Sequence, residues 1–175
     1  MNHVWLAFGA IFLCTFLFAG SVIAAGLSVG AEAPDFSAKA TGSRTIKLSE
    51  LKGKWIVLYF YPKADTPGCT KESCSLRDGY DAIKAAGAVI LGVSLDSVEN
   101  QEKFKSKYTF QFDLLSDSDK KISKAYGVLA VGGLFSQRKT FIIRPDGKIA
   151  YIFEKVDVGR HNEEVLAVLE NLAKK

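Results

Sequence analysis

The stretch WIVLYFYPKADTPGCTKESC, residues 55–74, is the part of the sequence that decides the fold. Its first seven residues, 55–61, are apolar, aromatic or β-branched and show no polar alternation. That pattern is typical of a strand covered on both faces of a sheet. Pro62 ends the strand, because proline has no backbone N–H to donate to a sheet ladder.

A helix is predicted directly after this strand. Thr66 is a suitable N-cap and Pro67 suits the first helical position, so we expect a helix from Thr66 to about residue 86. Cys69 then lies in the first turn. Free backbone N–H groups and the positive end of the helix dipole favour an anion there, which gives the sulfur a reason to ionise.

A helix terminus alone does not ionise a thiol near neutral pH. Lowering a thiol pKa from about 8.5 to about 6 requires about 3.4 kcal/mol, whereas a helix terminus contributes about 0.3–1 kcal/mol and at best about 2. A cation is therefore expected near Cys69. The candidates are Lys63, Lys71, Arg77 and the distant Arg138, and local spacing does not choose among them.

The pattern Pro62-x-x-x-Thr66-x-x-Cys69 resembles the active-site signature of the peroxiredoxins. The segment TPGCTKESC, residues 66–74, resembles in particular that of the peroxiredoxin Q, or bacterioferritin comigratory protein, subfamily. Similarity continues in four further segments: YGV at 126–128, RKTFII at 138–143, PDGK at 145–148 and HNEEVL at 161–166. It implies that residues 27–175 are a thioredoxin-like peroxiredoxin domain of the AhpC/TSA type.

By this resemblance Cys69 is the cysteine that attacks peroxide, Arg138 is the cation, Thr66 supplies a hydroxyl to the reacting centre, and Pro62 shields it. The implied substrate is hydrogen peroxide or a small organic hydroperoxide, with no metal, haem or flavin. When a thiolate breaks an O–O bond, negative charge develops on the departing oxygen, and a guanidinium and a hydroxyl can stabilise it. Simple helix capping by Thr66, strand termination by Pro62 and an ordinary surface charge at Arg138 are the alternatives.

Cys74 is the obvious second thiol, because the sulfenic acid formed on Cys69 needs one to return to the cycle. In one regular helix, residues five apart have Cα atoms roughly 8.6 Å apart, beyond the disulfide reach of about 7 Å. The pair can therefore close only if the start of the helix unwinds, which argues against a permanent structural disulfide. The resemblance implies such an intramolecular disulfide, reduced by thioredoxin or a thioredoxin-like protein; a small buried hydrophobe is the alternative for Cys74.

Two other classes of function are weighed. A thiol–disulfide oxidoreductase acting on protein cysteines is disfavoured because the chain has no Cys-x-x-Cys pattern, and a copper-binding or redox-sensor module using both cysteines is the other alternative. A zinc site is disfavoured by the small number of cysteines and histidines, and His161 is expected to be a cap-region or surface residue rather than a base. Nucleic-acid binding is unsupported, because the net charge of +4 is spread among acidic residues.

The rest of the chain alternates between strands and helices, which predicts an α/β, thioredoxin-like fold with a mixed sheet flanked by helices. The expected elements are a strand at 88–95, a helix at 97–107, a short strand at 114–115, a short helix at 118–125, a hairpin at 140–153 and a helix at 162–173. Residues 127–137 are predicted to be a loop that is mobile beside the site. The resemblance favours a monomer.

Residues 1–26 differ from the rest because they contain no Lys, Arg, Asp or Glu. Residues 4–25 are nearly all apolar, as in a secretory signal peptide cleaved near Ala24 or Ala25, or in an uncleaved membrane anchor. We therefore expect a protein that is exported to the periplasm or another extracytoplasmic space, or anchored to a membrane. Cys14 is expected to be only a hydrophobic filler of this segment.

Overall fold

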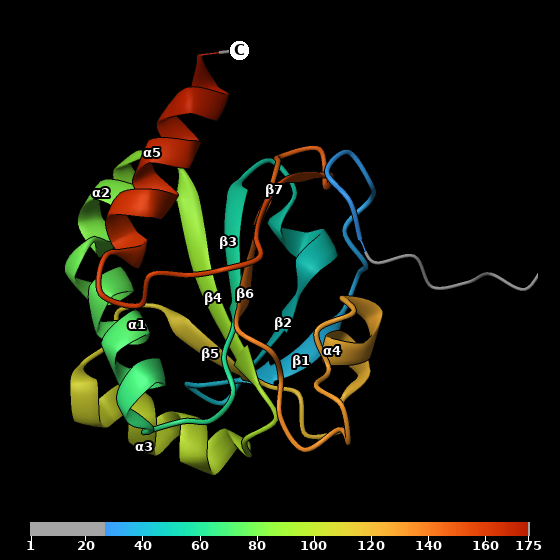
Figure 1. The fold of residues 1–175 in the computed structure, drawn as a ribbon, viewed down its shortest axis with the longest axis vertical. Helices are drawn as coiled ribbons and strands as arrows, with labels where there is room; N and C mark the ends of the chain where they lie inside the picture. Colours follow the sequence, from blue (N-terminus) through green and yellow to red (C-terminus); the bar gives the residue numbers. More distant parts are fainter. Residues whose placement is uncertain (1–26, 175) are drawn as a thin grey trace, which may run out of the picture.

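The computed structural model describes residues 27–174, and the predicted leader or anchor at 1–26 lies outside them. Seven strands form one mixed sheet in the order β2-β1-β5-β4-β3-β6-β7, with helices on both faces (Figure 1). This arrangement confirms the predicted fold class. None of the helices within 27–174 is long and apolar enough to cross a bilayer.

The bounds of the elements are as follows. The strands are β1 (Ser37–Ala40), β2 (Arg44–Lys47), β3 (Trp55–Phe60), β4 (Ala88–Ser94), β5 (Asp113–Ser116), β6 (Lys139–Ile143) and β7 (Ile149–Phe153). The helices are α1 (Pro67–Asp78), α2 (Tyr80–Ala85), α3 (Val98–Tyr108), α4 (Lys121–Ala125) and α5 (His161–Ala173), with a 3-10 helix, η1, at Leu48–Leu51.

Strand β3 lies in the interior of the sheet, parallel to β4 and antiparallel to β6. Alternate residues of the segment point into two separate cores: Ile56, Leu58 and Phe60 into one, Val57, Tyr59 and Tyr61 into the other. All six are at most 2% exposed. Burial on both sides is the physical reason why the sequence of this strand shows no polar alternation.

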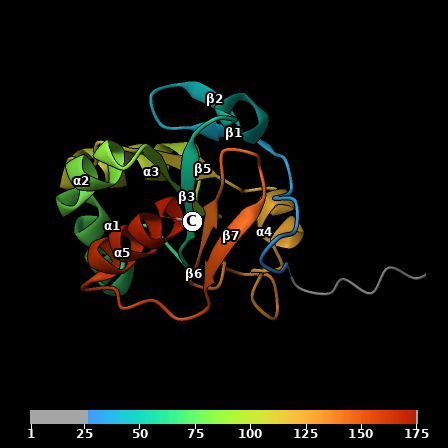
Figure 2. The same ribbon diagram turned by 90° about the horizontal axis from the view of Figure 1, so that it is seen from above.

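The two faces of the sheet are covered differently (Figures 1 and 2). Helices α1, α2, α3 and α5 pack over the core that contains Tyr59 and Tyr61. Helix α4, η1 and the segment before β1 pack over the core that contains Phe60. The larger helical layer therefore holds α1, which begins where β3 has just ended.

The predicted single helix to residue 86 is wrong in its extent, because α1 ends at Asp78 and α2 begins at Tyr80. At Gly79 an added Cβ would lie 2.5 Å from the Cβ of Asn162 in α5. The break therefore occurs where α5 crosses closely, and only glycine leaves room for it. Strands β1 and β2 and helix η1 were not predicted, since β1 and β2 are four residues each and β2 is largely exposed.

The other predicted elements are confirmed with small shifts at their ends. The helix expected from Ser118 begins at Lys121 instead, because the buried carboxylate of Asp117 accepts hydrogen bonds from the N–H groups of Ile122 and Ser123 and fixes the start. Residues 127–137 form a loop, closed by an isolated bridge between Leu129 and Ser136. The mobility of this loop stays a prediction.

We expect Gly92→Ala to destabilise the protein by about 2–3 kcal/mol, because overpacking a buried sheet forces neighbours to move. The added Cβ in β4 would lie 2.6 Å from the ring of Tyr59 and 2.7 Å from Leu114. Gly87→Ala is the control: its Cβ has open space, but φ is +79°, so about 1 kcal/mol is expected from backbone strain alone. Urea unfolding measures the free energy of unfolding of both variants. An equal loss of stability in the two variants would contradict the prediction that the Cβ at position 92 clashes with its neighbours.

Candidate active site

Cys69 lies in the first turn of α1 and is only 1% exposed. The turn exists because β3 ends at Phe60, the chain bends at Pro62, and Pro67 starts the helix without needing an N–H partner. The sulfur therefore sits among the free N–H groups of a helix start and inside the packed layer between α1 and the sheet. The helix start favours negative charge on the sulfur, and burial strengthens the interaction of the sulfur with a nearby charge.

The loop between β3 and α1 is fixed by contacts to the neighbouring elements. The N–H of Ala64 donates to Asp96, which follows β4, at 2.8 Å. Asp65 has a positive φ of 59° and its carboxylate accepts hydrogen bonds from Lys107 and Tyr108 of α3 at 2.7 and 2.8 Å. This anchoring sets the position at which α1, and with it Cys69, begins.

Arg138 is the cation that contacts the sulfur. Its Nη2 donates to Cys69 Sγ over 3.4 Å, although the two residues are 69 positions apart. The antiparallel pairing of β3 with β6 places Lys139 opposite Phe60, so Arg138 lies beside the end of β3. The pairing of β3 with β6 therefore decides which candidate cation contacts the sulfur, a question that local spacing left open.

Another candidate cation, Arg77, points elsewhere. It binds the carboxylate of Asp78 at 2.8 Å and donates to the carbonyl oxygen of Tyr108 at 3.1 Å. The structure therefore brings Cys69 together with Arg138, whereas Arg77 is bound to Asp78 and to the end of α3.

Glu72 is a site residue that the sequence analysis missed. It lies one turn after Cys69 in α1, is fully buried, and forms an ion pair with Arg138. Its other oxygen, Oε1, has no hydrogen-bond partner among the described residues. Burial raises the pKa of Glu72 to about 7, although the charge of Arg138 acts to lower it.

The guanidinium of Arg138 is therefore shared between two groups, the sulfur of Cys69 and the carboxyl of Glu72. Glu72 holds the guanidinium in place while it competes for part of the positive charge. A sequence signal existed, since positions i and i+3 lie on the same helix face. Nothing local, however, shows that this face is buried against Arg138.

Thr66 and Pro62 lie in the connection between β3 and α1. Thr66 is the N-cap residue of α1, as predicted, but its hydroxyl donates to the carbonyl oxygen of Lys63 at 2.9 Å and not to the reacting centre or the helix. Pro62 is half-buried and lines a hollow together with Leu134 and Phe135 of the 127–137 loop. The catalytic roles expected for Thr66 and Pro62 stay predictions.

Cys74 lies later in α1, is half-buried, and is free, as Cys69 is. Burial raises the pKa of the Cys74 thiol. The next residue, Ser75, exchanges hydrogen bonds with Asn162 of α5: its hydroxyl donates to Oδ1 at 2.9 Å and accepts from the backbone N–H at 3.1 Å. Cys74 thus lies beside the part of α1 that Asn162 holds in place, whereas Cys69 lies at the start of α1.

His161 lies in the cap region of α5, one of the two predicted positions, but the alternative that it lies at the surface is wrong. Its side chain is fully buried at the start of α5, where Nε2 hydrogen-bonds the hydroxyl of Thr140 over 2.8 Å and Nδ1 lies 3.2 Å from a carboxylate oxygen of Glu164. The ring also packs edge-on against Phe153. Burial lowers the pKa of His161. The start of α5 is pressed against β6 and β7, and a surface position was expected because this packing is not visible in the sequence.

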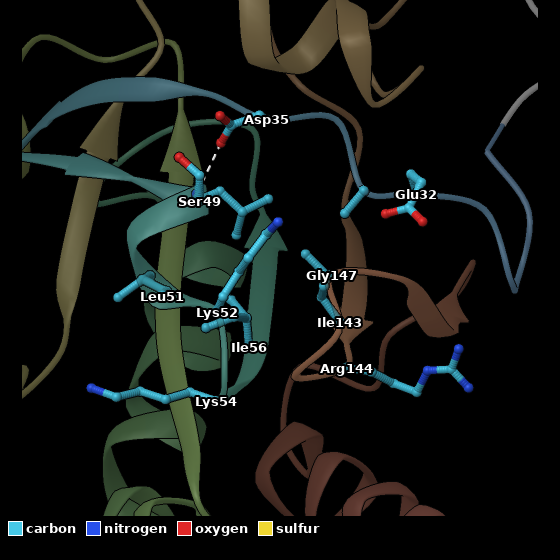
Figure 3. A pocket seen from close by; sticks show the side chains of 12 residues that line it. Glu32, Asp35, Ser49, Leu51, Lys52, Lys54, Ile56, Ile143, Arg144 and Gly147 are labelled. Carbon is cyan, nitrogen blue, oxygen red and sulfur yellow. Dashed lines mark hydrogen bonds between the residues drawn. The ribbon is translucent and has the colours of Figure 1, made fainter.

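A separate cavity of about 210 Å³ lies at the opposite end of β3 (Figure 3). Its apolar wall includes Leu51, Ile56 and Ile143, and its rim carries charges of both signs. Figure 3 also shows the hydrogen bond from the N–H of Ser49 to Asp35, at 2.9 Å, which closes one side. None of the predicted site residues lines this cavity. Within residues 27–174, no cluster of three or more His, Cys, Asp or Glu side chains could hold a metal ion.

Comparison with known proteins gives consistent matches. The model of the AhpC/TSA family matches residues 29–152. Peroxiredoxin Bcp of Bacillus subtilis is 41% identical over 155 residues, which are 85% of this chain and 99% of that protein. Chloroplastic peroxiredoxin Q of Oryza sativa subsp. japonica is 37% identical over 153 residues, 86% of this chain and 70% of that protein. A cysteine-to-serine mutant of Xylella fastidiosa PrxQ superposes with a TM-score of 0.79 at 33% identity, covering 85% of this chain and 99% of that one.

We expect Glu72→Gln to remove a pH-dependent part of the stability. The pKa of Glu72 is raised by folding to about 7, so its stabilising contribution is complete below the unfolded value of about 4.3 and is lost as the pH rises through about 7. The wild-type free energy of unfolding should therefore fall relative to that of Glu72→Gln between about pH 5 and pH 8, by on the order of 2 kcal/mol.

Urea unfolding of residues 27–175, followed by the fluorescence of Trp55, measures this difference. The control is Glu170→Gln, which removes an exposed carboxylate at the far end of α5 and should leave the wild-type pH dependence unchanged. A constant difference between wild type and Glu72→Gln across this pH range would show that Glu72 does not titrate there.

Proposed function

This chain belongs to the AhpC/TSA family and is a thiol peroxidase of the peroxiredoxin Q type, and from that premise we propose that Cys69 reduces hydroperoxides in a cycle that Cys74 completes. The observation that carries the proposal is the 3.4 Å hydrogen bond from Arg138 to the buried sulfur of Cys69. A thiol at a helix start and next to a guanidinium is in the surroundings typical of reactive cysteines.

In the first step the Cys69 thiolate attacks one oxygen of the hydroperoxide. An S–O bond forms and the O–O bond breaks, and the electron pair leaves on the other oxygen, which takes up a proton to become an alcohol or water. Cys69 is thereby oxidised to a sulfenic acid. Arg138 stabilises both the thiolate and the departing oxygen, and the hydroxyl of Thr66 assists once it turns from the carbonyl of Lys63 toward the peroxide. Pro62 shields the opening.

In the second step the sulfur of Cys74 attacks the sulfenic sulfur of Cys69. An S–S bond forms, the S–O bond breaks, and the hydroxyl leaves as water with the proton of the Cys74 thiol. Because α1 is continuous over both residues, its first turns must unwind for the sulfurs to meet. The hydrogen bonds between Ser75 and Asn162 limit this unwinding to the part of α1 before Ser75. Unwinding also exposes Cys74, which relieves the burial that raises the pKa of its thiol.

In the third step the dithiol of a thioredoxin-like protein returns both cysteines to thiols. It supplies the two electrons and leaves oxidised as its own disulfide. One chain contributes every protein group of the first two steps, which supports a monomer as the functional unit. The apolar, uncharged segment at 4–25 supports export or membrane anchoring, in which case the reductant would act in that same compartment.

The two cysteine roles make different predictions. Cys69→Ser should abolish consumption of hydrogen peroxide in the presence of a thioredoxin system, because the attacking atom is gone. Cys74→Ser should consume about one equivalent and stop with one oxygen atom added to Cys69, as seen by mass spectrometry. Peroxide consumption that continues in Cys69→Ser would contradict the proposed function.

The role of Arg138 predicts that its variants react more slowly with hydrogen peroxide, to an extent that depends on whether the positive charge is kept. Arg138→Met should slow the reaction of the reduced enzyme with hydrogen peroxide by roughly 30- to 150-fold, corresponding to the loss of about 2–3 kcal/mol from one charged hydrogen bond in the site. Arg138→Lys should lose less, because the charge remains. Arg144→Met, beyond the other end of β6, is the matched control and should react at the wild-type rate. Stopped-flow measurement of Trp55 fluorescence gives these rates, and an unchanged rate in Arg138→Met would rule out the assigned role.

A further inference from the structure

The 127–137 loop presents apolar side chains to solvent. Val131 is fully exposed, Leu134 is 81% exposed and Phe135 is 45% exposed. They are three of only five large apolar side chains that are exposed within residues 27–174. Gly132 and Gly133, both with positive φ, form the turn that carries them outward. Adjacent exposed apolar side chains of this kind mark an interaction surface.

Lys120, the residue before α4, and Lys124, within α4, lie next to this loop. Lys120 lies close to Gly133 of the loop, with its Nζ 3.9 Å from where a Cβ would stand. Lys120 and Lys124 form no ion pair with any residue that the structure describes, whereas Lys121 is bound to Asp119 at 2.6 Å. The patch is therefore apolar at its tip and positively charged at its side. We call the 127–137 loop with Lys120 and Lys124 the loop–α4 surface.

The start of the described chain lies on the same side of the molecule. In Figures 1 and 2, α4, the 127–137 loop and the segment that follows Leu27 all lie on the side of the sheet away from α1, α2 and α5. Residues 4–25, shortly before Leu27 in the sequence, are nearly all apolar and carry no charged side chain. An apolar segment of about 20 residues is long enough to enter a bilayer.

From these observations we infer that the loop–α4 surface binds the surface of an anionic lipid bilayer. Apolar side chains enter the interface between head groups and acyl chains, while lysines are attracted to anionic head groups. A protein partner with an apolar face would not by itself account for the two unpaired lysines or for the apolar segment that precedes Leu27 in the sequence.

The same surface is next to the candidate active site along the chain. Leu134 and Phe135 line one hollow with Pro62, and Arg138 follows the loop directly in the chain. Binding of the bilayer by this surface does not depend on the proposed function.

The test is co-sedimentation of residues 27–175 with vesicles of phosphatidylcholine alone or with one third phosphatidylglycerol. The domain can be used alone, because the two cores lie within it and a relative of nearly this length aligns over 99% of its own chain. Binding is expected only to the vesicles with phosphatidylglycerol. The double variant Lys120→Asn/Lys124→Gln should bind roughly 10- to 30-fold more weakly, since each lysine near an anionic surface contributes about 1 kcal/mol.

The double variant Val131→Ser/Leu134→Ser should lose binding by at least about tenfold, because it removes the inserted apolar groups. The controls are Lys52→Gln, at the opposite end of the sheet, and Tyr151→Thr, an exposed apolar position on β7; both should bind as wild type does. Cys69→Ser should also bind normally, which separates a failure of the binding inference from a failure of the proposed function.

Two results would overturn the inference. One is equal or absent binding to the two kinds of vesicle, and the other is binding that the loop–α4 variants do not weaken. Absent vesicle binding together with slower reduction by thioredoxin in the loop variant would identify this as a protein-docking surface instead.

Discussion

The pairing of β3 with β6 is the constraint on which the site depends. It places Arg138 beside the end of β3, while the chain leaving β3 turns back at once into α1 and delivers Cys69. The 3.4 Å contact between guanidinium and sulfur follows from these two connections together. A slip of one residue in this antiparallel register would turn the side chains of β6 to the other face of the sheet. The buried alternation of β3 and β6 therefore protects the chemistry as well as the fold.

Glu72 adds a third ionisable group to this site, so the charge of Arg138 is divided between the Glu72 carboxyl and the Cys69 sulfur. The carboxyl is buried, one of its oxygens is unpartnered among the described residues, and its pKa is raised to about 7. Near neutral pH the proton therefore occupies Glu72 for part of the time, and Arg138 then directs its charge mainly to Cys69. An acid with no hydrogen-bond partner on one oxygen is costly to bury, and such groups in native proteins commonly belong to functional sites.

Helix α1 combines a fixed half with a half that the proposed cycle must unwind. Ser75 is held to Asn162, and the break at Gly79 allows α5 to approach closely enough to make that contact. The first turn has no side-chain cap, because the hydroxyl of Thr66 is directed to the carbonyl of Lys63. The end of the helix that carries Cys69 is thus the less firmly held end. This asymmetry supports an exchange between a state that reacts with peroxide and a state that forms the disulfide.

The sequence by itself determined what depends on neighbouring residues. The unbroken apolar run at 55–61, the Thr66-Pro67 helix start and the hairpin around residues 145–147 are local patterns of burial, capping and turn chemistry, and the strand, helix and hairpin form there. The mixed sheet flanked by helices followed from the order of such elements. The position of Cys69 in the first turn of α1 was predictable for the same reason.

Only the tertiary structure decided what depends on residues far apart in the chain. It selected Arg138 among four cations, buried Glu72 and His161, broke the helix at Gly79 where α5 crosses, and turned the hydroxyl of Thr66 to a loop carbonyl. The short strands β1 and β2 also depend on it, since they are stabilised by pairing with each other and with β5 and carry no strong pattern of their own. Local patterns fix which segments form helices and strands, whereas charges and close packing are set by which segments meet.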